Sequence, residues 1–283
     1  MHHLKLPYYL NFKGFIVLIL ILVINLNPSF AQDTYDQAFE NNLDEILFTR
    51  TTSYTELESL FREFKNDSVK MKQLNERVVK GSYFEAESYA LNALGVIYRN
   101  LSKYDKAIDY HEYAEEVATY CQNLELKVLS LNMLGVVYRR MDLVSSALDY
   151  HSQALEFART ANPITEQLEL SIAVSLNSMG NIYLVLKQYD LAIEQFNKSL
   201  EIENKSENKL GLAINYQNIG YAKEAKGLLN EALKDYQTSL KYNEDINSDI
   251  GKVICFNSIG KIYIKQQKYD EAITLLQDAL AKA

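Results

Sequence analysis

The chain has 283 residues, 48% hydrophobic and 23% charged, with a formal net charge of −8. That much apolar material can form a sizeable core, which excludes a disordered polymer. An acidic chain without a run of lysines and arginines also lacks the basic patch on which binders of nucleic acid or anionic membranes depend. Glycine, proline and tryptophan are scarce, so the composition favours helices.

Residues 1–31 have the pattern of a signal peptide. Two lysines precede a wholly apolar stretch at 15–24, and the small residues Ser29 and Ala31 stand just before a cut at Gln32. A bilayer-spanning helix needs about 20 apolar residues, and this stretch has roughly half that. We therefore predict an exported protein, periplasmic or secreted by a bacterium, whose mature chain does not bind membranes. An uncleaved anchor is the alternative.

Residues 32–82 carry two amphipathic segments, "YTELESLFREF" and "DSVKMKQLNERVVKG". The second is opened by Asp67, a favoured N-cap, and closed by Gly81. Later in the chain, a repeat of about 40 residues carries a glycine and an alanine at fixed positions. At the equivalent positions this region has Thr55 and Asp67. This region is predicted to be a degenerate N-terminal helical cap.

From residue 83 onward the chain repeats itself. Glycines recur at intervals of 40, 45, 40 and 40 residues, and an alanine stands twelve residues after each one. Such a period is typical of a helical solenoid, in which each unit buries its apolar face against its neighbours. The five predicted units cover about 83–122, 123–162, 168–207, 208–247 and 248–283, and the repeated glycines are Gly95, Gly135, Gly180, Gly220 and Gly260.

Each position in the frame has a mechanical role. Glycine and alanine let the two helices of a unit approach closely, and large leucine and tyrosine side chains fill the seam between them. One residue per unit belongs to the favoured N-cap set and is predicted to begin the second helix. These residues are Asp105, Ser145, Asp190, Asn230 and Asp270.

This frame resembles the tetratricopeptide repeat family. The likeness is best in the third unit, "LNSMGNIYLVLKQYDLAIEQFNKSL", with Gly180, Tyr183, Ala192 and Phe196 at the family's positions. It implies an all-α fold, a right-handed α-solenoid of antiparallel helix pairs. The 40-residue period resembles a longer-helix subclass found in bacterial regulators and motor-adaptor proteins. Lys223 departs from the pattern, where other units carry tyrosine.

Two irregularities interrupt the frame. Five extra residues lie around "TANPITEQLE", where Pro163 predicts a break or a lengthened turn. The sequence stops at Ala283, inside the second helix of the fifth unit, whereas solenoids usually finish with a polar capping helix. We expect either a truncated sequence or a further region after it.

Candidates for catalysis are few. "HEYAE" begins with His111 and Glu112, but a zincin helix would need a second histidine at position 115, which is a glutamate. His111 and His151 occupy the same repeat position, so packing roles are predicted for both. Cys121 and Cys255 lie three units apart, too far for a disulfide, and are predicted to be free, largely buried thiols. We expect no enzyme, no cofactor and no metal.

Side-chain amides recur at one position in the first helix of each unit. In related repeat proteins with this longer period, an asparagine ladder on the concave face holds peptide backbones, and the resemblance extends that role here. The alternative is that these amides only bridge neighbouring helices, and the sequence does not separate the two. The amide row consists of Asn92, Asn132, Asn177, Gln217 and Asn257.

Basic residues lie further along the same helices. In an acidic chain they suggest a partner with carboxylates, with solvated surface residues as the alternative. They are Arg99, Arg139 and Arg140 in units one and two, and Lys261 and Lys265 in unit five.

The sequence therefore predicts an exported, non-catalytic scaffold that binds a protein or an extended peptide in its concave groove, and not nucleic acid. An acidic peptide is one candidate for that ligand. The alternative is the periplasmic sensory input region of a sensor histidine kinase or transcriptional regulator. The sequence predicts neither the ligand nor the oligomeric state.

Overall fold

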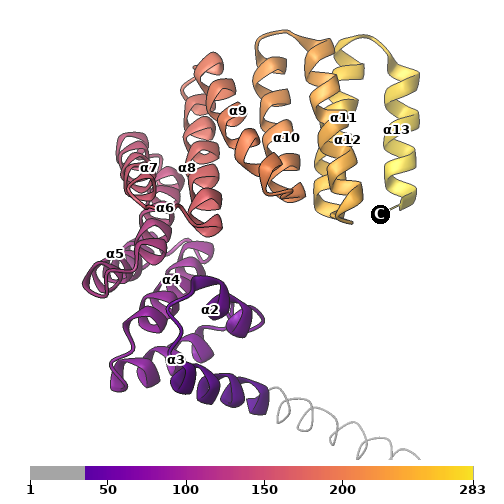
Figure 1. The fold of residues 1–283 in the computed structure, drawn as a ribbon. Helices are drawn as coiled ribbons and strands as arrows, with labels where there is room; N and C mark the ends of the chain where they lie inside the picture. The colour runs from indigo at the N-terminus through magenta and orange to yellow at the C-terminus, as the bar shows by residue number, and fades with distance from the viewer. Residues whose placement is uncertain (1–35, 283) are drawn as a thin grey trace, which may run out of the picture.

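The structure is a computed structural model that describes residues 36–282, and the predicted signal peptide lies outside this range. Every regular element within 36–282 is a helix (Figure 1). Residues 36–49 are helical, and the helices that follow are α2 (Tyr54–Phe61), α3 (Ser68–Lys80), α4 (Phe84–Asn100), α5 (Tyr104–Tyr120), α6 (Leu124–Arg140), α7 (Val144–Arg159), α8 (Glu166–Val185), α9 (Tyr189–Lys205), α10 (Lys209–Ala225), α11 (Leu229–Asp245), α12 (Asp249–Lys265) and α13 (Tyr269–Lys282).

From α4 onward the helices form five pairs stacked into a curved solenoid. Each helix packs against the next in the chain, and the first helix of each pair also contacts the first helix of the next pair (α4 with α6, and so on to α10 with α12). The second helices make at most marginal contact with one another. The side on which successive units lie closest is the inside of the curve, so the first helices line the concave face (Figure 1).

Within each of the first four pairs, a ring of the second helix lies against the glycine of the first. A Cβ atom added to Gly95 would lie 2.5 Å from the His111 ring, and one added to Gly180 would lie 2.5 Å from the Phe196 ring. Such distances are well inside van der Waals contact, so the ring and the glycine are complementary in size. Only Gly260 differs among the repeated glycines, since its nearest neighbour, Leu276, would lie at 3.5 Å. The repeated alanines are all buried (Ala107, Ala147, Ala192, Ala232 and Ala272).

The prediction that Asp105 and its equivalents are N-caps is wrong. Helix α5 begins at Tyr104 after the N-cap Lys103, so Asp105 is the second helical residue. The turn before it is closed by the backbone: Ser102 has a positive φ of 57°, and the Lys103 N–H donates to the Tyr98 carbonyl. This αL closure places the N-cap at Lys103, two residues before the predicted Asp105. The other residues predicted as caps, Ser145, Asp190, Asn230 and Asp270, are likewise the second residues of their helices.

Side-chain caps occur instead at the starts of the first helices. Asn123, Thr165, Asn208 and Ser248 each accept a hydrogen bond from a backbone N–H in the first turn of the helix that follows. They occupy the turns between units, including the longer connection at 160–165 that contains Pro163.

The residues before α4 form an apolar cap on the first unit. The helix at 36–49 buries Phe39, Leu43 and Ile46 against side chains of α2 and α3. Helix α3 begins after Asp67, whose carboxylate accepts from two backbone N–H groups, and ends at Gly81, as predicted. The helix at 36–49 was not predicted, although its buried residues recur at helical spacing.

The two cysteines are free. Cys255 is buried, as predicted, while Cys121 is only partly buried because it terminates α5 at the edge of a turn.

Candidate functional site

The candidate site is the concave face formed by α4, α6, α8, α10 and α12. The amide row begins there with two buried residues. Asn92 is 4% exposed and Asn132 is 1% exposed. The Asn92 amide donates to the Ser130 hydroxyl at 2.8 Å, and its oxygen lies 2.9 Å from the Nδ1 of His111.

Asn132 repeats this arrangement one unit later. Its amide donates to the Ser171 carbonyl, and its oxygen accepts from the Ser175 hydroxyl and contacts the Nδ1 of His151 at 3.0 Å. Both side chains therefore tie one unit to the next. These contacts match the bridging alternative, and a peptide in the groove would have to displace them.

Two further amides of the row are only partly buried. The Asn177 amide donates to the oxygen of Asn215 at 2.8 Å, and the Gln217 amide donates to the Ser258 hydroxyl at 2.8 Å. These two also bridge successive first helices, but each keeps surface toward the groove.

Asn257 differs from the other members of the row. It is exposed on α12, and no side-chain hydrogen bond of Asn257 is found among the described residues. Of the five amides it is the one most available to a ligand.

Three arginines come together at the C-terminal ends of α4 and α6. Burial lowers the pKa of Arg99, and the charges of Arg140 and Arg139 lower it further. The pKa of Arg139 is also lowered, first by burial and then by the charge of Arg140. We call Arg99, Arg139 and Arg140 the arginine cluster.

The lysines of the fifth unit are arranged differently. Lys265 forms an ion pair with Glu224 at 2.6 Å, while Lys261 is exposed on α12. The basic residues predicted for binding therefore do not form one continuous surface: the arginine cluster lies in units one and two, and the lysines lie three units away.

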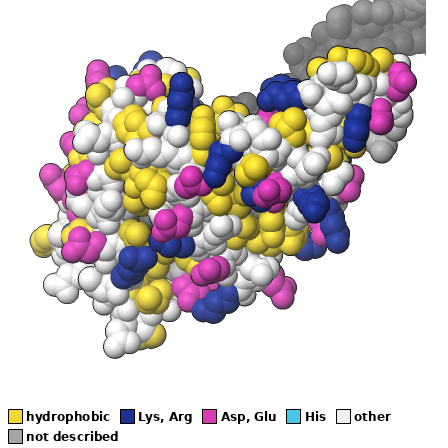
Figure 2. Space-filling model, turned by 90° about the horizontal axis from the view of Figure 1, so that it is seen from above, with side chains coloured by type: hydrophobic (Ala, Val, Ile, Leu, Met, Phe, Trp, Pro, Cys, Tyr) yellow, Lys and Arg dark blue, Asp and Glu magenta, His cyan; other side chains and the backbone are white. Residues whose placement is uncertain are grey.

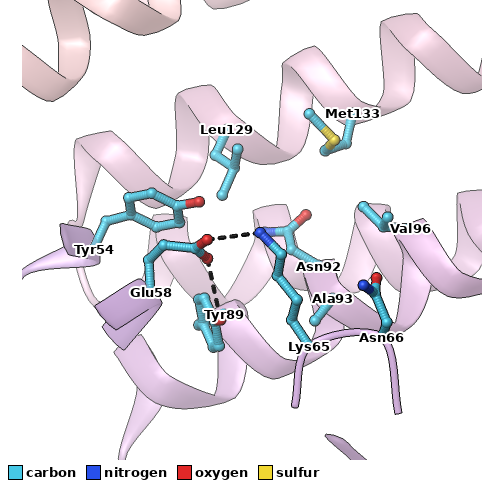
Figure 3. A pocket seen from close by; sticks show the side chains of 10 residues that line it. All are labelled: Tyr54, Glu58, Lys65, Asn66, Tyr89, Asn92, Ala93, Val96, Leu129 and Met133. Carbon is cyan, nitrogen blue, oxygen red and sulfur yellow. Dashed lines mark hydrogen bonds and ion pairs between the residues drawn. The ribbon is translucent and has the colours of Figure 1, made fainter. Parts of the chain in front are cut away.

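A pocket of about 190 Å³ opens where α2 and the turn after it face α4 and α6; we call it the N-terminal pocket (Figure 3). Ala93, Val96, Leu129 and Met133 provide apolar walls. Glu58 lies at one side, accepting from Lys65 at 2.7 Å and from the Tyr89 hydroxyl at 3.2 Å (Figure 3). Because its carboxylate is already paired, the pocket is suited to an apolar group.

A second hollow of about 370 Å³ lies between α10 and α12; we call it the C-terminal groove. Leu210, Ile214, Ile250 and Ile254 supply its apolar lining, and Gln217 and Asn218 supply amides. These lining residues were not predicted from the sequence, although the repeat carries a signal for them.

The missed signal is an aliphatic residue three positions before the amide in units two to five, where unit one has Tyr89. In units three to five these residues are Val174, Ile214 and Ile254, spaced 40 residues apart, and they are 42%, 44% and 47% exposed. Isolated exposed aliphatic side chains are ordinary. A row at equivalent positions of three successive first helices instead forms an exposed apolar strip, the kind of surface that often marks an interaction site in proteins.

Elsewhere the surface is mixed. On the face drawn in Figure 2, hydrophobic side chains lie among lysines, arginines and acidic residues, and neither charge sign dominates. His111 and His151 are fully buried against their glycines, and burial lowers the pKa of each to about 3, so both are neutral at pH 7. Their predicted packing roles are confirmed.

Two other features bear on the class of protein. Within residues 36–282, no group of three or more His, Cys, Asp or Glu side chains is placed to hold a metal ion. Helix α8 is long and apolar enough to cross a membrane, but half of that stretch is buried inside the solenoid, between α7 and α9.

Sequence comparison gives the family. A tetratricopeptide repeat model matches residues 171–245 and 212–283, and a second one matches residues 90–114. The chain therefore contains tetratricopeptide repeats. A search of curated proteins finds no match to this tetratricopeptide repeat chain.

Solved structures show the same fold. BtubC (BKLC) from P. vanneervenii aligns over 84% of this chain and 90% of its own, with a TM-score of 0.61 and 15% identity. The apo form of RapI aligns over 68% of this chain and 69% of its own, with a TM-score of 0.59 and 20% identity. A kinesin light chain-like repeat protein from P. anserina covers 68% of this chain and 92% to 93% of its own in two structures, both with a TM-score of 0.54 and 17% identity. At these identities the likeness concerns the fold.

Proposed function

We propose that this tetratricopeptide repeat protein is a non-catalytic scaffold that binds a protein partner, through an extended segment, on its concave face. The observation that carries the proposal is the exposed aliphatic row Val174, Ile214 and Ile254 beside the C-terminal groove. Apolar side chains of a partner would bury this row, and the adjacent amides of Gln217 and Asn218 would bond its backbone.

The family supports a binding role without specifying the partner. Tetratricopeptide repeats are generally protein-interaction scaffolds, and the neighbours BtubC and RapI share the solenoid. The proposed assignment to the longer-period subclass rests on the glycine spacing alone. The proposal that the partner is acidic rests on the arginine cluster.

Selection of a displayed random peptide library on the purified chain tests the proposal. Ile214→Asp places a charge in the C-terminal groove at an exposed position and should weaken selected peptides by about tenfold or more, since one buried aliphatic contact contributes about 1.5–3 kcal/mol. Leu191→Asp is the matched control, because Leu191 is 42% exposed but lies on the second helix α9. Equal affinity for both variants would show that the peptides bind elsewhere.

We also propose that the mature chain is exported and begins at or near Gln32. The apolar stretch at 15–24 and the small residues Ser29 and Ala31 support this. N-terminal sequencing of the protein from a bacterial host tests it, and an intact Met1 on a soluble cytoplasmic product would contradict it.

The alternative, a sensory input region of a sensor kinase or transcriptional regulator, would use the same concave face. It differs in requiring an output region after residue 283, which the gene sequence would reveal as a membrane-spanning stretch followed by a kinase, or as a DNA-binding pattern.

A further inference from the structure

The arginine cluster has no acidic partner. Arg99 makes its polar contacts with neutral groups, namely the Asn100 oxygen at 3.2 Å and the Met133 sulfur at 3.8 Å. The Nε of Arg139 is buried without a hydrogen-bond partner. Within residues 36–282 no carboxylate pairs with Arg99, Arg139 or Arg140, and the charges that perturb the pKa values of Arg99 and Arg139 are those of other arginines.

The repeat itself shows what is unusual here. Lys265 stands five residues after Gly260, and its partner Glu224 stands four residues after Gly220, in the preceding unit. The equivalent positions in units two and one are Arg140 and Arg99. The site that holds an ion pair between units four and five therefore holds two like charges between units one and two.

Like charges in a partly desolvated site repel one another, and a bound anion would relieve that repulsion. A single carboxylate would leave two of the three positive charges uncompensated. A phosphate monoester carries a charge of about −1.5 to −2 at pH 7 and has three acceptor oxygens, which suit several guanidinium groups. The chemistry of the cluster therefore favours a doubly charged oxyanion.

The cluster also adjoins space for the rest of a ligand. Met133, which contacts Arg99, is a wall of the N-terminal pocket (Figure 3). A segment whose charged group lies on the arginines could place a neighbouring apolar side chain in that pocket.

We propose that Arg99, Arg139 and Arg140 form a binding site for the phosphate group of a phosphorylated residue in the partner. This inference rests on the proposed function, because the phosphate would be carried by a segment bound on the concave face. The anionic part of the partner would therefore bind to units one and two, and not to unit five.

Calorimetric titration at constant ionic strength and pH 7.5 tests the site with three probes: inorganic phosphate, N-acetyl-phosphoserine amide and N-acetyl-glutamate amide. Both phosphate probes should bind saturably, and the glutamate probe at least about tenfold more weakly, as expected when a charge-assisted contact is lost. Binding of inorganic phosphate alone would overturn the phosphorylated-partner proposal, and so would equal binding of the glutamate probe or no saturable binding.

Arg99→Glu is the decisive variant, because it recreates between units one and two the ion pair that Lys265 and Glu224 form between units four and five. It should abolish phosphate binding while raising the melting temperature. Lys261→Glu changes the charge by the same amount at an exposed residue of α12 and should leave phosphate binding intact. Equal binding by the two variants would overturn the site.

Arg140→Gln, at an exposed position, serves as a second variant if Arg99→Glu fails to fold. Peptides selected for the C-terminal groove should bind the Arg99→Glu protein normally. Wild-type protein that binds those peptides but no phosphate probe would contradict this inference alone, whereas failure to select any peptide would contradict the proposed function.

Discussion

The Nδ1 of His111 lies 2.9 Å from the side-chain oxygen of Asn92 in the interior of the first unit, and His151 and Asn132 repeat the pair at 3.0 Å. Each imidazole also packs on the glycine of its unit, and its Nε2 is buried without a hydrogen-bond partner. A neutral ring fits this environment and a charged ring does not, which makes the pair a source of acid sensitivity.

Acidification should therefore destabilise the protein through these two histidines. Burial, and then the charges of Arg99 and Arg139, lower their pKa values to about 3 from an ordinary 6.5. Between these pH values the unfolded chain binds protons that the folded chain does not, so the free energy of unfolding falls as pH falls from 6.5 toward 3. Each histidine should contribute a slope of about 1.4 kcal/mol per pH unit.

Urea unfolding of His111→Phe and His151→Phe at several pH values measures that slope. Phenylalanine is the residue of the third unit at this position, Phe196, so the shape should be accommodated. The double variant should lose most of the pH dependence between 6.5 and 4 that wild type shows. An unchanged slope would mean that the imidazoles are not the groups that titrate on unfolding.

Adding a methyl group to the repeated glycines should have opposite effects in units three and five. Gly180→Ala would place a Cβ 2.5 Å from Phe196 and should destabilise the protein, because overpacking costs about 1–3 kcal/mol. Gly260→Ala meets nothing closer than 3.5 Å and should stabilise α12 by about 0.5–1 kcal/mol. Thermal melts compare the two, and the same sign for both would refute the ring-on-glycine packing.

The fourth unit replaces a tyrosine pair with charges. Tyr98 stacks on Tyr110 at 5.2 Å in unit one, and Lys223 pairs with Asp235 at 2.7 Å at the equivalent place in unit four. Lys223→Tyr alone should leave the partly buried Asp235 without its cation and cost about 1–3 kcal/mol. Lys223→Tyr with Asp235→Tyr should recover most of that loss. A double-mutant cycle in urea measures the coupling, and strictly additive effects would count against the equivalence.

The effect on stability of replacing a residue of the amide row should depend on how deeply that residue is buried. Asn132→Ala removes three buried hydrogen-bond contacts and should cost about 1–3 kcal/mol of stability, whereas Asn257→Ala at an exposed position should cost little. Denaturation together with peptide titration of both variants checks this. Unchanged stability with lost peptide binding in Asn132→Ala would restore that residue to a peptide-binding role.

The solenoid could be predicted from the sequence because the same pattern of small and large residues recurs in every unit. Gly95 and His111 were each predicted to be packing residues because both recur with the frame, but their contact with one another was not predicted. The start of α5 was misplaced because Ser102 adopts a positive φ without being glycine, and no composition signal marks that. The N-terminal helix at 36–49 was missed despite a readable pattern.

The candidate site was only partly predictable. Whether Asn92 faces the groove or a neighbouring helix depends on how closely α4 and α6 approach, and a periodicity fixes only which side of its own helix a residue occupies. Arg99, Arg139 and Arg140 were predicted as basic candidate residues, but that they lie without an acidic partner was not, because Arg99 is about 40 residues from the other two in the chain. The repeat frame does contain that information, once Arg99 and Arg140 are compared with Glu224 and Lys265.

Photo-crosslinking tests the concave-face claim most directly. A benzoylphenylalanine is placed at position 214 on α10 or at position 191 on α9, and each protein is irradiated with the same library-selected peptide. Crosslinking at 214 and none at 191 is the predicted result. Crosslinking at 191 with none at 214 would contradict the proposal, because the peptide would then lie on the second helices and not in the groove.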